Sequence, residues 1–373
     1  MYTIIKKLFI LTFLFLLLAC IKEDYEACDV YLEFIFDYNM EFTDTFEKEV
    51  EMVDVYVFDA DGYYLFNRHA ECATDLIGRK RMVLDNGFTV GTYHLLTVGG
   101  LTGNFRFSDL NDGPFQPGVT SYKEAKLSLY HETNDVSEEF PHLWFGETTV
   151  INYNADLAVW QTRMIRETNR FHVTLKCTNT DHQQKKNTLY TFDIITPESG
   201  AYGYDNQPRI KEQVTYHPYY LVSGTQPDLL AEAHLATMRL FANEREDYRL
   251  VVRRTDNQQE VWSYNLISLL EKAAYRPDGT ILPLQEYLDR ECDWNIIIYC
   301  KEDPEGPDPE DPDPEDPDPE DPDPEDPDPE DPDPEDPDPE DPDPEDPDPD
   351  SGAFIAVAIE INGWIIWLND IDL

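Results

Sequence analysis

The chain has 373 residues and carries 28 lysines and arginines against 77 aspartates and glutamates, a formal net charge of −49. Much of this charge is concentrated in residues 302–350, which hold 29 acidic residues, no basic residue and 19 of the 28 prolines. A chain this acidic, with no basic stripe, is not expected to bind nucleic acid or an anionic membrane surface through charge. The other 324 residues have the composition of a folded protein and are enough for about two domains of ~150 residues.

Residues 1–19 have the pattern of a secretory signal peptide. Lysines are followed by an apolar run at residues 8–18, which is too short to span a hydrocarbon core of ~30 Å. The run is followed by Ala19 and Cys20, and a small residue before a cysteine is similar to the lipobox of bacterial lipoproteins. This similarity implies cleavage before Cys20 and acylation of both its thiol and the new N-terminus. The alternative is an ordinary secretory signal with an incidental cysteine.

Residues 20–27 are interpreted as a lipidated tether to a membrane. More than one acyl chain on Cys20 would hold the protein stably, at ~0.8 kcal/mol per buried methylene. The following Lys22, Glu23 and Asp24 resemble the surface-export signal of lipoproteins in Bacteroides-type Gram-negative bacteria. That resemblance implies a lipid-anchored protein on the outer face of the outer membrane. The alternative for these three residues is a solvated charged linker.

The body of the chain predicts an all-β fold, because short segments rich in Val, Ile, Tyr, Phe and Thr alternate apolar and polar residues. We assign residues 28–155 to an N-terminal β-sandwich. The Asp-Gly pair that ends at Gly62 predicts a hairpin between residues 53–58 and 63–66. The other strands predicted in this domain are residues 30–37, 81–85, 92–98, 125–130 and 143–150.

Residues 156–373 are assigned to a second β-sandwich, with the boundary in the polar segment 152–156. Helices are expected to be few and short: residues 265–275 have apolar residues at helical spacing after Asn265, a possible N-cap, and residues 284–289 form one further turn. The predicted architecture is therefore two β-sandwiches in tandem. The strands predicted in the second domain are residues 171–177, 189–195, 214–222, 235–241, 248–254, 260–264, 294–300 and 353–361.

The acidic segment 302–350 interrupts the second domain and is not a tail. Pro-Glu-Asp-Pro-Asp is repeated from residue 309 to residue 348, with no apolar residue that could build a core. Strand-like sequence lies on both sides of it, so we interpret the repeat as a long loop between two neighbouring strands. Proline density and charge repulsion favour an extended polyproline II conformation. Either the repeat is a neutral expansion in a tolerant loop, or it acts as a charged spacer or weak cation sink.

The C-terminal residues 362–373 form a second candidate hairpin and an apolar end. Asn362 and Gly363 are a strong two-residue turn signal, and residues 364–368 after them are all apolar. Both faces of such a strand need cover, from the same domain or from a partner. Chain ends are usually polar and loose, but the apolar alternation continues here to the last residue. The residues proposed for a junction with another subunit are Asn362, Gly363, Trp364, Trp367, Ile371 and Leu373.

Residue patterns that carry chemistry are scarce. No pair of cysteines forms C-x-x-C, and no histidines form H-x-x-x-H or H-E-x-x-H, so we expect no metal site and no cofactor. The sequence Val222-Ser223-Gly224 lacks the leading glycine of a nucleophile elbow. We therefore expect no catalytic residues and no enzymatic activity.

Together these features resemble the fimbrillin-associated anchor lipoproteins that hold type V fimbriae in oral and gut anaerobes. The resemblance is carried by the lipobox at Cys20, the hairpin from Val55 to Gly62 and the terminal segment from Ile359 to Trp364. It implies two transthyretin-like β-sandwiches and a non-enzymatic role as the membrane-bound base of a fimbrium. It also implies a fimbrillin shaft subunit as the partner, with the outer membrane contacted through the N-terminal lipid. The acidic repeat departs from the family, although only at a loop.

A second hypothesis is a surface carbohydrate-binding lipoprotein of a glycan-uptake system, which would also be lipidated and rich in strands. Such a protein needs exposed aromatic rings that stack on sugars. The alternative for the candidate tyrosines is packing within strands and turns. The candidates are Tyr202, Tyr204, Tyr216, Tyr219 and Tyr220.

Overall fold

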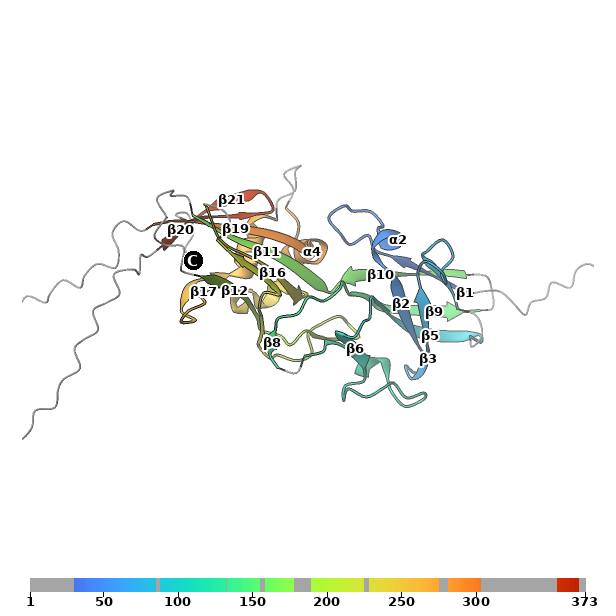
Figure 1. Cartoon of the computed structure of the whole chain (residues 1–373). Helices are drawn as coiled ribbons and strands as arrows, with labels where there is room; N and C mark the ends of the chain where they lie inside the picture. The colour runs from blue at the N-terminus through green and yellow to red at the C-terminus, as the bar shows by residue number, and fades with distance from the viewer. Residues whose placement is uncertain are drawn as a thin grey trace, which may run out of the picture.

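The structure is a computed structural model that describes residues 30–84, 88–131, 133–154, 158–177, 189–224, 228–274, 281–302 and 354–368. Its sheets form an elongated molecule of two lobes, with β1 (Val30–Ile35) in one lobe and the hairpin of β20 (Phe354–Ile361) and β21 (Trp364–Trp367) in the other (Figure 1). The predicted all-β fold class is confirmed. No helix in these residue ranges is long and apolar enough to cross a membrane.

The N-terminal lobe is built on a seven-stranded sheet with the order β3-β2-β5-β9-β10-β1-β4. The predicted hairpin is present: β2 and β3 pair in antiparallel register, and Gly62 takes the positive φ of 89° that the turn requires. The Asp59 carboxylate accepts hydrogen bonds from the backbone N–H groups of Asp61 and Tyr63, which holds the turn. The remaining strands of this sheet are β2 (Met52–Phe58), β3 (Tyr64–Glu71), β4 (Arg81–Val83), β5 (Gly91–Gly99), β9 (Trp144–Tyr153) and β10 (Ala158–Arg166).

Strand β10 carries the first sheet beyond the position where the sequence suggested a change of domain. It pairs with β9 in antiparallel register and with β1 in parallel register, so the sheet extends to Arg166 and not only to residue 155. The first residues of the polar segment belong to β9, and β10 of the same sheet begins at Ala158, so this segment does not end the sheet. The pairing of β1 with β10 joins residues more than 120 positions apart, and local sequence patterns carry no signal for such a contact.

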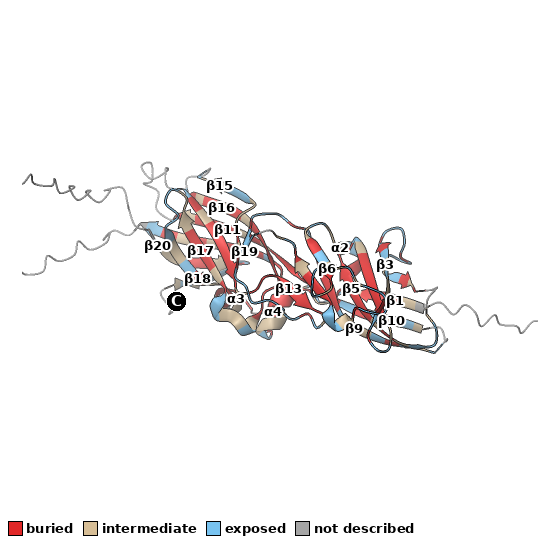
Figure 2. Cartoon of the chain, turned by 90° about the horizontal axis from the view of Figure 1, so that it is seen from below, coloured by how far each residue is buried: buried red, intermediate tan, exposed pale blue. Residues whose placement is uncertain are grey.

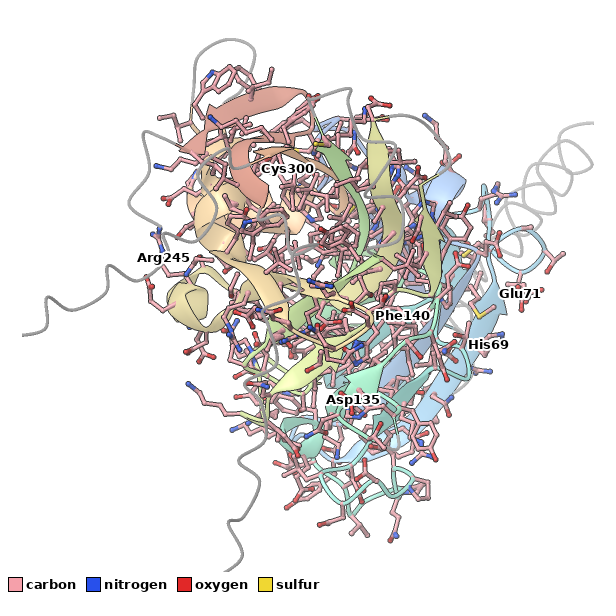
Figure 3. All side chains as sticks on the ribbon, turned by 60° about the vertical axis from the view of Figure 1, so that its left-hand side comes forward. His69, Glu71, Asp135, Phe140, Arg245 and Cys300 are labelled. Atoms are coloured by element: carbon pink, nitrogen blue, oxygen red, sulfur yellow. The ribbon has the colours of Figure 1, made fainter. Side chains whose placement is uncertain are left out.

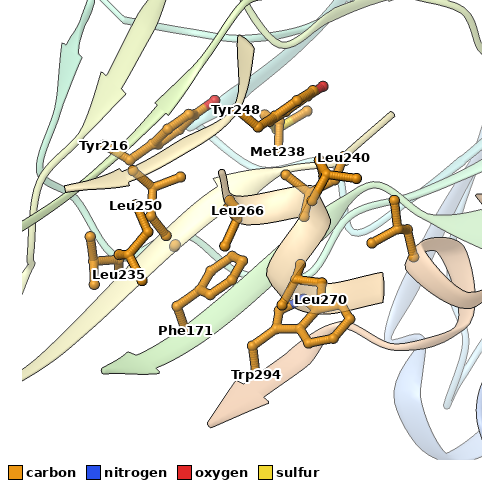
Figure 4. Close-up of a cluster of buried hydrophobic side chains, with 14 of the residues drawn as sticks. Phe171, Tyr216, Leu235, Met238, Leu240, Tyr248, Leu250, Leu266, Leu270 and Trp294 are labelled. Carbon is orange, nitrogen blue, oxygen red and sulfur yellow. The ribbon is translucent and has the colours of Figure 1, made fainter. Parts of the chain in front are cut away.

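The C-terminal lobe contains a six-stranded sheet, β15-β16-β11-β19-β20-β21, and a five-stranded sheet, β18-β17-β12-β14-β8. Figure 4 shows Phe171, Trp294, Tyr216 and Leu250, contributed by both sheets, in one buried cluster. The strands not yet bounded are β8 (Asp135–Val136), β11 (Thr168–Cys177), β12 (Tyr190–Thr196), β14 (Val214–Tyr216), β15 (Tyr220–Ser223), β16 (Leu229–Met238), β17 (Arg249–Arg254), β18 (Glu260–Asn265) and β19 (Asp293–Glu302).

One strand predicted at residues 214–222 is two strands in the structure, and they lie in different sheets. β14 belongs to the five-stranded sheet, and β15 belongs to the six-stranded sheet. Pro218 lies between them and has no backbone N–H to donate to a ladder, so the chain leaves one sheet before it and enters the other after it. β16 also begins earlier than expected, at Leu229 and not at residue 235.

A small third sheet pairs strands from early and later parts of the chain and links the two lobes. Its order is β13-β7-β6, with β6 (Phe105–Ser108) and β7 (Lys126–Leu129) from the first half of the chain and β13 (Ala201–Gly203) from later in the sequence. β8 likewise comes from the early part of the chain but pairs with β14 in the C-terminal lobe. One cluster of buried side chains consequently runs from β2 in the N-terminal lobe to β20 in the C-terminal lobe, and a second cluster lies within the N-terminal lobe. Figure 2 shows buried residues along the strands of both lobes.

The helices in the described part of the chain are few and short, as predicted. They are α2 (Phe46–Glu49), α3 (Leu266–Lys272) and α4 (Leu284–Arg290), with 3-10 turns at η1 (Tyr122–Glu124) and η2 (Ala242–Asp247). The predicted N-cap of α3 is confirmed: the Asn265 side chain accepts a hydrogen bond of 2.8 Å from the Ser268 backbone N–H.

The strands on either side of the acidic repeat are neighbours. β19 and β20 pair in antiparallel register, with Lys301 opposite Ile355 and Glu302 opposite Phe354. The prediction that the repeat joins two adjacent strands is therefore confirmed. The repeat itself lies outside the described residues.

Candidate functional site

The C-terminal hairpin is held to the sheet through its turn. Asn362 and Gly363 have φ angles of 47° and 88°, the positive values that a two-residue hairpin turn requires. The Asn362 side-chain oxygen accepts a 2.8 Å hydrogen bond from the Asn295 backbone N–H, and the Asn362 backbone N–H donates to the Asn295 carbonyl at 2.9 Å. The turn is thus fastened to the start of β19 as well as to its own strands.

Strand β21 exposes one apolar face. Ile365 and Trp367 are 56% and 60% exposed, whereas Ile366 between them and Leu368 after them pack against the core. The sequence suggested that both faces of this strand need cover. Among the described residues the inner face is covered at Ile366 and Leu368, although Trp364 at the start of the strand is 48% exposed. The outer face presents a large aliphatic and a large aromatic side chain to solvent.

Strand β21 is also the last strand of its sheet. The order of the six-stranded sheet ends there, so no described strand pairs with its outer edge. An edge strand offers a row of backbone N–H and C=O groups on which another strand can pair. Four of the proposed junction residues, Asn362, Gly363, Trp364 and Trp367, lie together in this hairpin. The other two, Ile371 and Leu373, lie outside the described residues.

The proposed lipidation and export-signal residues precede the described part of the chain. Cys20, Lys22, Glu23 and Asp24 lie outside the described residues, which begin at Val30. Strand β1, the first described element, lies in the N-terminal lobe, away from the lobe that carries β20 and β21 (Figure 1).

The five candidate sugar-stacking tyrosines do not form one exposed platform. Tyr202 and Tyr216 are 0% and 1% exposed, which confirms packing as the role of these two rings. Tyr204 packs edge-on against Tyr122 at a centroid distance of 5.2 Å. Tyr219 and Tyr220 lie elsewhere, beside β16 of the six-stranded sheet.

Two buried carboxyl groups have strongly raised pKa values. Burial raises the pKa of Glu167 and that of Glu198 to about 7. Each already has a partner inside the protein: Asn206 donates to Glu167 at 2.6 Å, and the Tyr248 hydroxyl donates to Glu198. The first contact joins the residue before β11 to the loop after β13, and the second joins the loop after β12 to the residue before β17. Both groups are therefore best understood as parts of the buried core.

Comparison with known families decides which family the chain belongs to. Residues 25–312 match the model of the fimbrillin-A associated anchor proteins Mfa1 and Mfa2. The chain belongs to this family. The resemblance inferred from Cys20, the first hairpin and the terminal segment is therefore confirmed at the level of the family. The match to the family model ends at residue 312, before β20 and β21 begin. The argument for a role of this hairpin therefore depends on its geometry alone.

Among solved structures, this anchor-family chain is similar to a candidate adhesin and to a fimbrial anchor protein. A protein from Bacteroides ovatus, described as a candidate adhesin, is 40% identical, with 75% of this chain and 92% of that chain covered and a TM-score of 0.68. Candidate polysaccharide binding proteins from Bacteroides thetaiotaomicron are 24% identical, with 92% and 99% covered and a TM-score of 0.68.

The fimbrial anchor protein Mfa2 from Porphyromonas gingivalis is 16% identical, with 91% of this chain and 98% of that chain covered and a TM-score of 0.59. It and the Bacteroides thetaiotaomicron proteins fall below 25% identity and show the shared fold alone. None of the curated proteins matches the sequence. The family and the candidate adhesin together support a role as a fimbrial anchor or adhesin associated with the cell surface.

Proposed function

We propose that this protein is the lipid-anchored base of a fimbrium and that the outer edge of β21 is its junction with the first shaft subunit. The observation that carries the proposal is an exposed apolar edge strand at the end of a sheet, in a chain of the fimbrial anchor family. Its role is structural and not catalytic, and its partner is a fimbrillin shaft subunit.

The arrangement of the two lobes suits a base subunit. Cys20 precedes β1 by ten residues, and ten residues of extended chain reach at most about 35 Å. Acylation at Cys20 would therefore keep the N-terminal lobe close to the outer membrane. The hairpin β20–β21 lies in the other lobe and would point away from the membrane (Figure 1). With Lys22, Glu23 and Asp24 acting as the export signal, the protein would stand on the outer face of that membrane.

A strand of the shaft subunit would pair with β21 and extend the six-stranded sheet. Backbone hydrogen bonds would supply affinity, and the alternating side chains would fix the register. Ile365 and Trp367 lie two positions apart on one face of β21, so both would be covered by side chains of the added strand. Burying them would remove from water the two most exposed apolar side chains of this strand.

The experiment places a lysine on the proposed junction and compares it with a lysine on the opposite edge of the same sheet. Ile365→Lys puts a charge on β21, where charges on edge strands discourage pairing. Leu221→Lys does the same on β15, whose Leu221 is 39% exposed. We expect cells with Ile365→Lys to keep the anchor but to shed fimbriae into the medium, and cells with Leu221→Lys to retain them.

Quantitative immunoblotting would measure the fimbriae in the medium and on the cells. Protease treatment of whole cells would measure how much of the anchor protein is exposed at the cell surface. Retention of fimbriae by Ile365→Lys cells, at wild-type levels of surface anchor, would place the junction elsewhere. Equal shedding in both variants would point to a general effect on the sheet and would also reject β21 as the junction.

A further inference from the structure

Two histidines face each other across neighbouring strands of the six-stranded sheet. β11 and β16 pair in antiparallel register, and His172 is directly opposite His234. Residues in this relationship have Cβ atoms about 4.5–5.5 Å apart and share one face of the sheet. Their imidazole rings lie edge to face with centroids 4.7 Å apart. The neighbouring residues Phe171 and Val173 are buried, so the two histidines lie on the outer face.

A carboxylate completes the cluster. Glu232 lies two residues before His234 on β16 and therefore points to the same face. Its Oε1 atom is 3.1 Å from His172 Nε2 and 3.8 Å from His234 Nε2. The ligand atoms of all three residues lie within 4.8 Å of one another, and no other group of three such residues in the described ranges is gathered in this way.

One nitrogen in this cluster lacks a hydrogen bond. Within the described structure His172 Nε2 is shielded from solvent and has no hydrogen-bond partner, although Glu232 Oε1 is close enough for an ionic contact. A buried polar atom without a hydrogen bond is costly, so such an atom calls for an explanation such as a bound ion. A cation between the three side chains would use this lone pair.

We propose that His172, Glu232 and His234 bind a divalent transition-metal ion of the zinc class. Zinc accepts imidazole nitrogen at ≈ 2.0–2.1 Å and carboxylate oxygen at ≈ 2.0–2.2 Å, and sites with two histidines and one carboxylate are a common zinc donor set. One ion would draw the three ligand atoms, now within 4.8 Å of one another, closer together through rotation of their side chains. The imidazole pair selects against calcium and magnesium, which take oxygen ligands.

The site has room for a further ligand. The side chains of His172, Glu232 and His234 are 44%, 32% and 37% exposed, so an ion can enter from solvent and keep at least one position open. Tyr220 lies across from His234 in the strand register, and its ring centroid is 4.8 Å from that of the histidine. This contact limits the movement of one ligand. Water is the expected fourth ligand.

The acidic repeat makes the choice of assay important, because its carboxylates also attract divalent cations. The full-length chain, purified in detergent and freed of metal, would be titrated with zinc by calorimetry in the presence of excess calcium. Calcium occupies carboxylate-only sites but competes poorly for imidazole nitrogen. We expect one equivalent of zinc to bind under these conditions.

His172→Ala and His234→Ala should each weaken zinc binding by more than about 100-fold, since even second-shell changes cost about 10–100-fold. The matched control is His69→Ala on β3. His69 is also an exposed strand histidine with two carboxylates beside it, Asp54 at 3.1 Å and Glu71 at 3.4 Å. His69 and Glu71 are labelled in Figure 3. Within the described residues His69 is not part of a three-residue group that could hold a metal ion. This variant should bind zinc like the wild type.

Cobalt substitution gives a second measurement on the unmodified protein, which does not depend on the folding of any variant. We expect bound cobalt to give the visible d–d bands of a low-symmetry site with nitrogen ligands. These bands should disappear when one equivalent of zinc is added. Zinc binding that survives in both histidine variants, or a wild-type cobalt spectrum like that of hydrated cobalt, would overturn the proposal. So would equal loss of binding in His69→Ala.

Discussion

Arg239 and Asp289 form a buried ion pair with two parallel hydrogen bonds. Arg239 Nε donates to Asp289 Oδ1 at 2.7 Å, and Nη2 donates to Oδ2 at 2.9 Å. Both side chains are almost fully buried, and the pair ties the chain just after β16 to helix α4. The two hydrogen bonds offset the free-energy cost of removing both charges from water, but only while both partners are present.

Asp289→Asn should therefore destabilise the protein by about 3–5 kcal/mol, because it leaves the Arg239 charge buried without its carboxylate. The matched control is Asp256→Asn, which breaks the exposed pair with Arg254 at 2.7 Å and should leave the unfolding midpoint near that of the wild type. Urea unfolding followed by tryptophan fluorescence measures both. If Asp289→Asn lowers the free energy of unfolding no more than the control does, the buried pair contributes little to stability.

Glu198 should make stability depend on pH. Burial raises its pKa from 4.5 to about 7 in the folded protein, so between these values the folded state binds a proton that the unfolded state has released. This contribution is fully present below pH 4.5 and is lost as the pH rises through about 7. The loss is on the order of 3 kcal/mol.

Glu198→Gln keeps the shape of the side chain and its contact with Tyr248 but cannot ionise. The difference in unfolding free energy between this variant and the wild type should therefore grow in favour of the variant from pH 5 to pH 8. Unfolding in urea at a series of pH values gives this difference, and the many other carboxylates cancel in it. A difference that stays constant across the range would mean that Glu198 is ionised in the fold.

The acidic repeat should be dispensable for folding. β19 and β20 are hydrogen-bonded neighbours, with Cys300 opposite Ala356, so a short turn of glycine and asparagine can replace residues 302–350. Shortening the loop removes about three doublings of its length, worth roughly 2 kcal/mol of closure entropy. The melting temperature, measured by calorimetry, should stay equal or rise. Loss of a cooperative transition would show instead that the repeat is part of the fold.

Cys20 should be the residue that holds the protein on the membrane. Cys20→Ala removes the thiol that would carry the acyl chains, so the variant should leave the membrane fraction. Metabolic labelling with a fatty acid should mark the wild type and not the variant. Equal labelling of the two proteins would end the lipoprotein interpretation, whereas labelling lost without release from membranes would reveal a second attachment.

Features that depend on a few neighbouring residues could be predicted from the sequence. The hairpin turn at Gly62, the turn at Asn362–Gly363 and the N-cap at Asn265 all follow from backbone preferences and short-range hydrogen bonds. The position of the acidic repeat between two paired strands was also predictable, because apolar strand sequence lies on each side of it.

Features that depend on long-range register could not be predicted in this way. The parallel pairing of β1 with β10 and the three-stranded sheet that links β7 to β13 join segments distant in the sequence. The burial of Tyr202 and the exposure of Tyr220 differ although both are strand tyrosines, since burial depends on which face of which sheet a residue occupies.

The all-β class, the local turns and caps, and the family resemblance follow from the sequence, because each depends on motifs of residues that are close along the chain. The edge position of β21 and the contact between His172 and His234 are set by the arrangement of strands in the folded sheet. The sequence contains Glu232 and His234 two positions apart, a strand spacing that puts both on one face, but their partner is 60 or more residues away. Strand register alone brings these groups together, and register is set by the packing of the whole sheet.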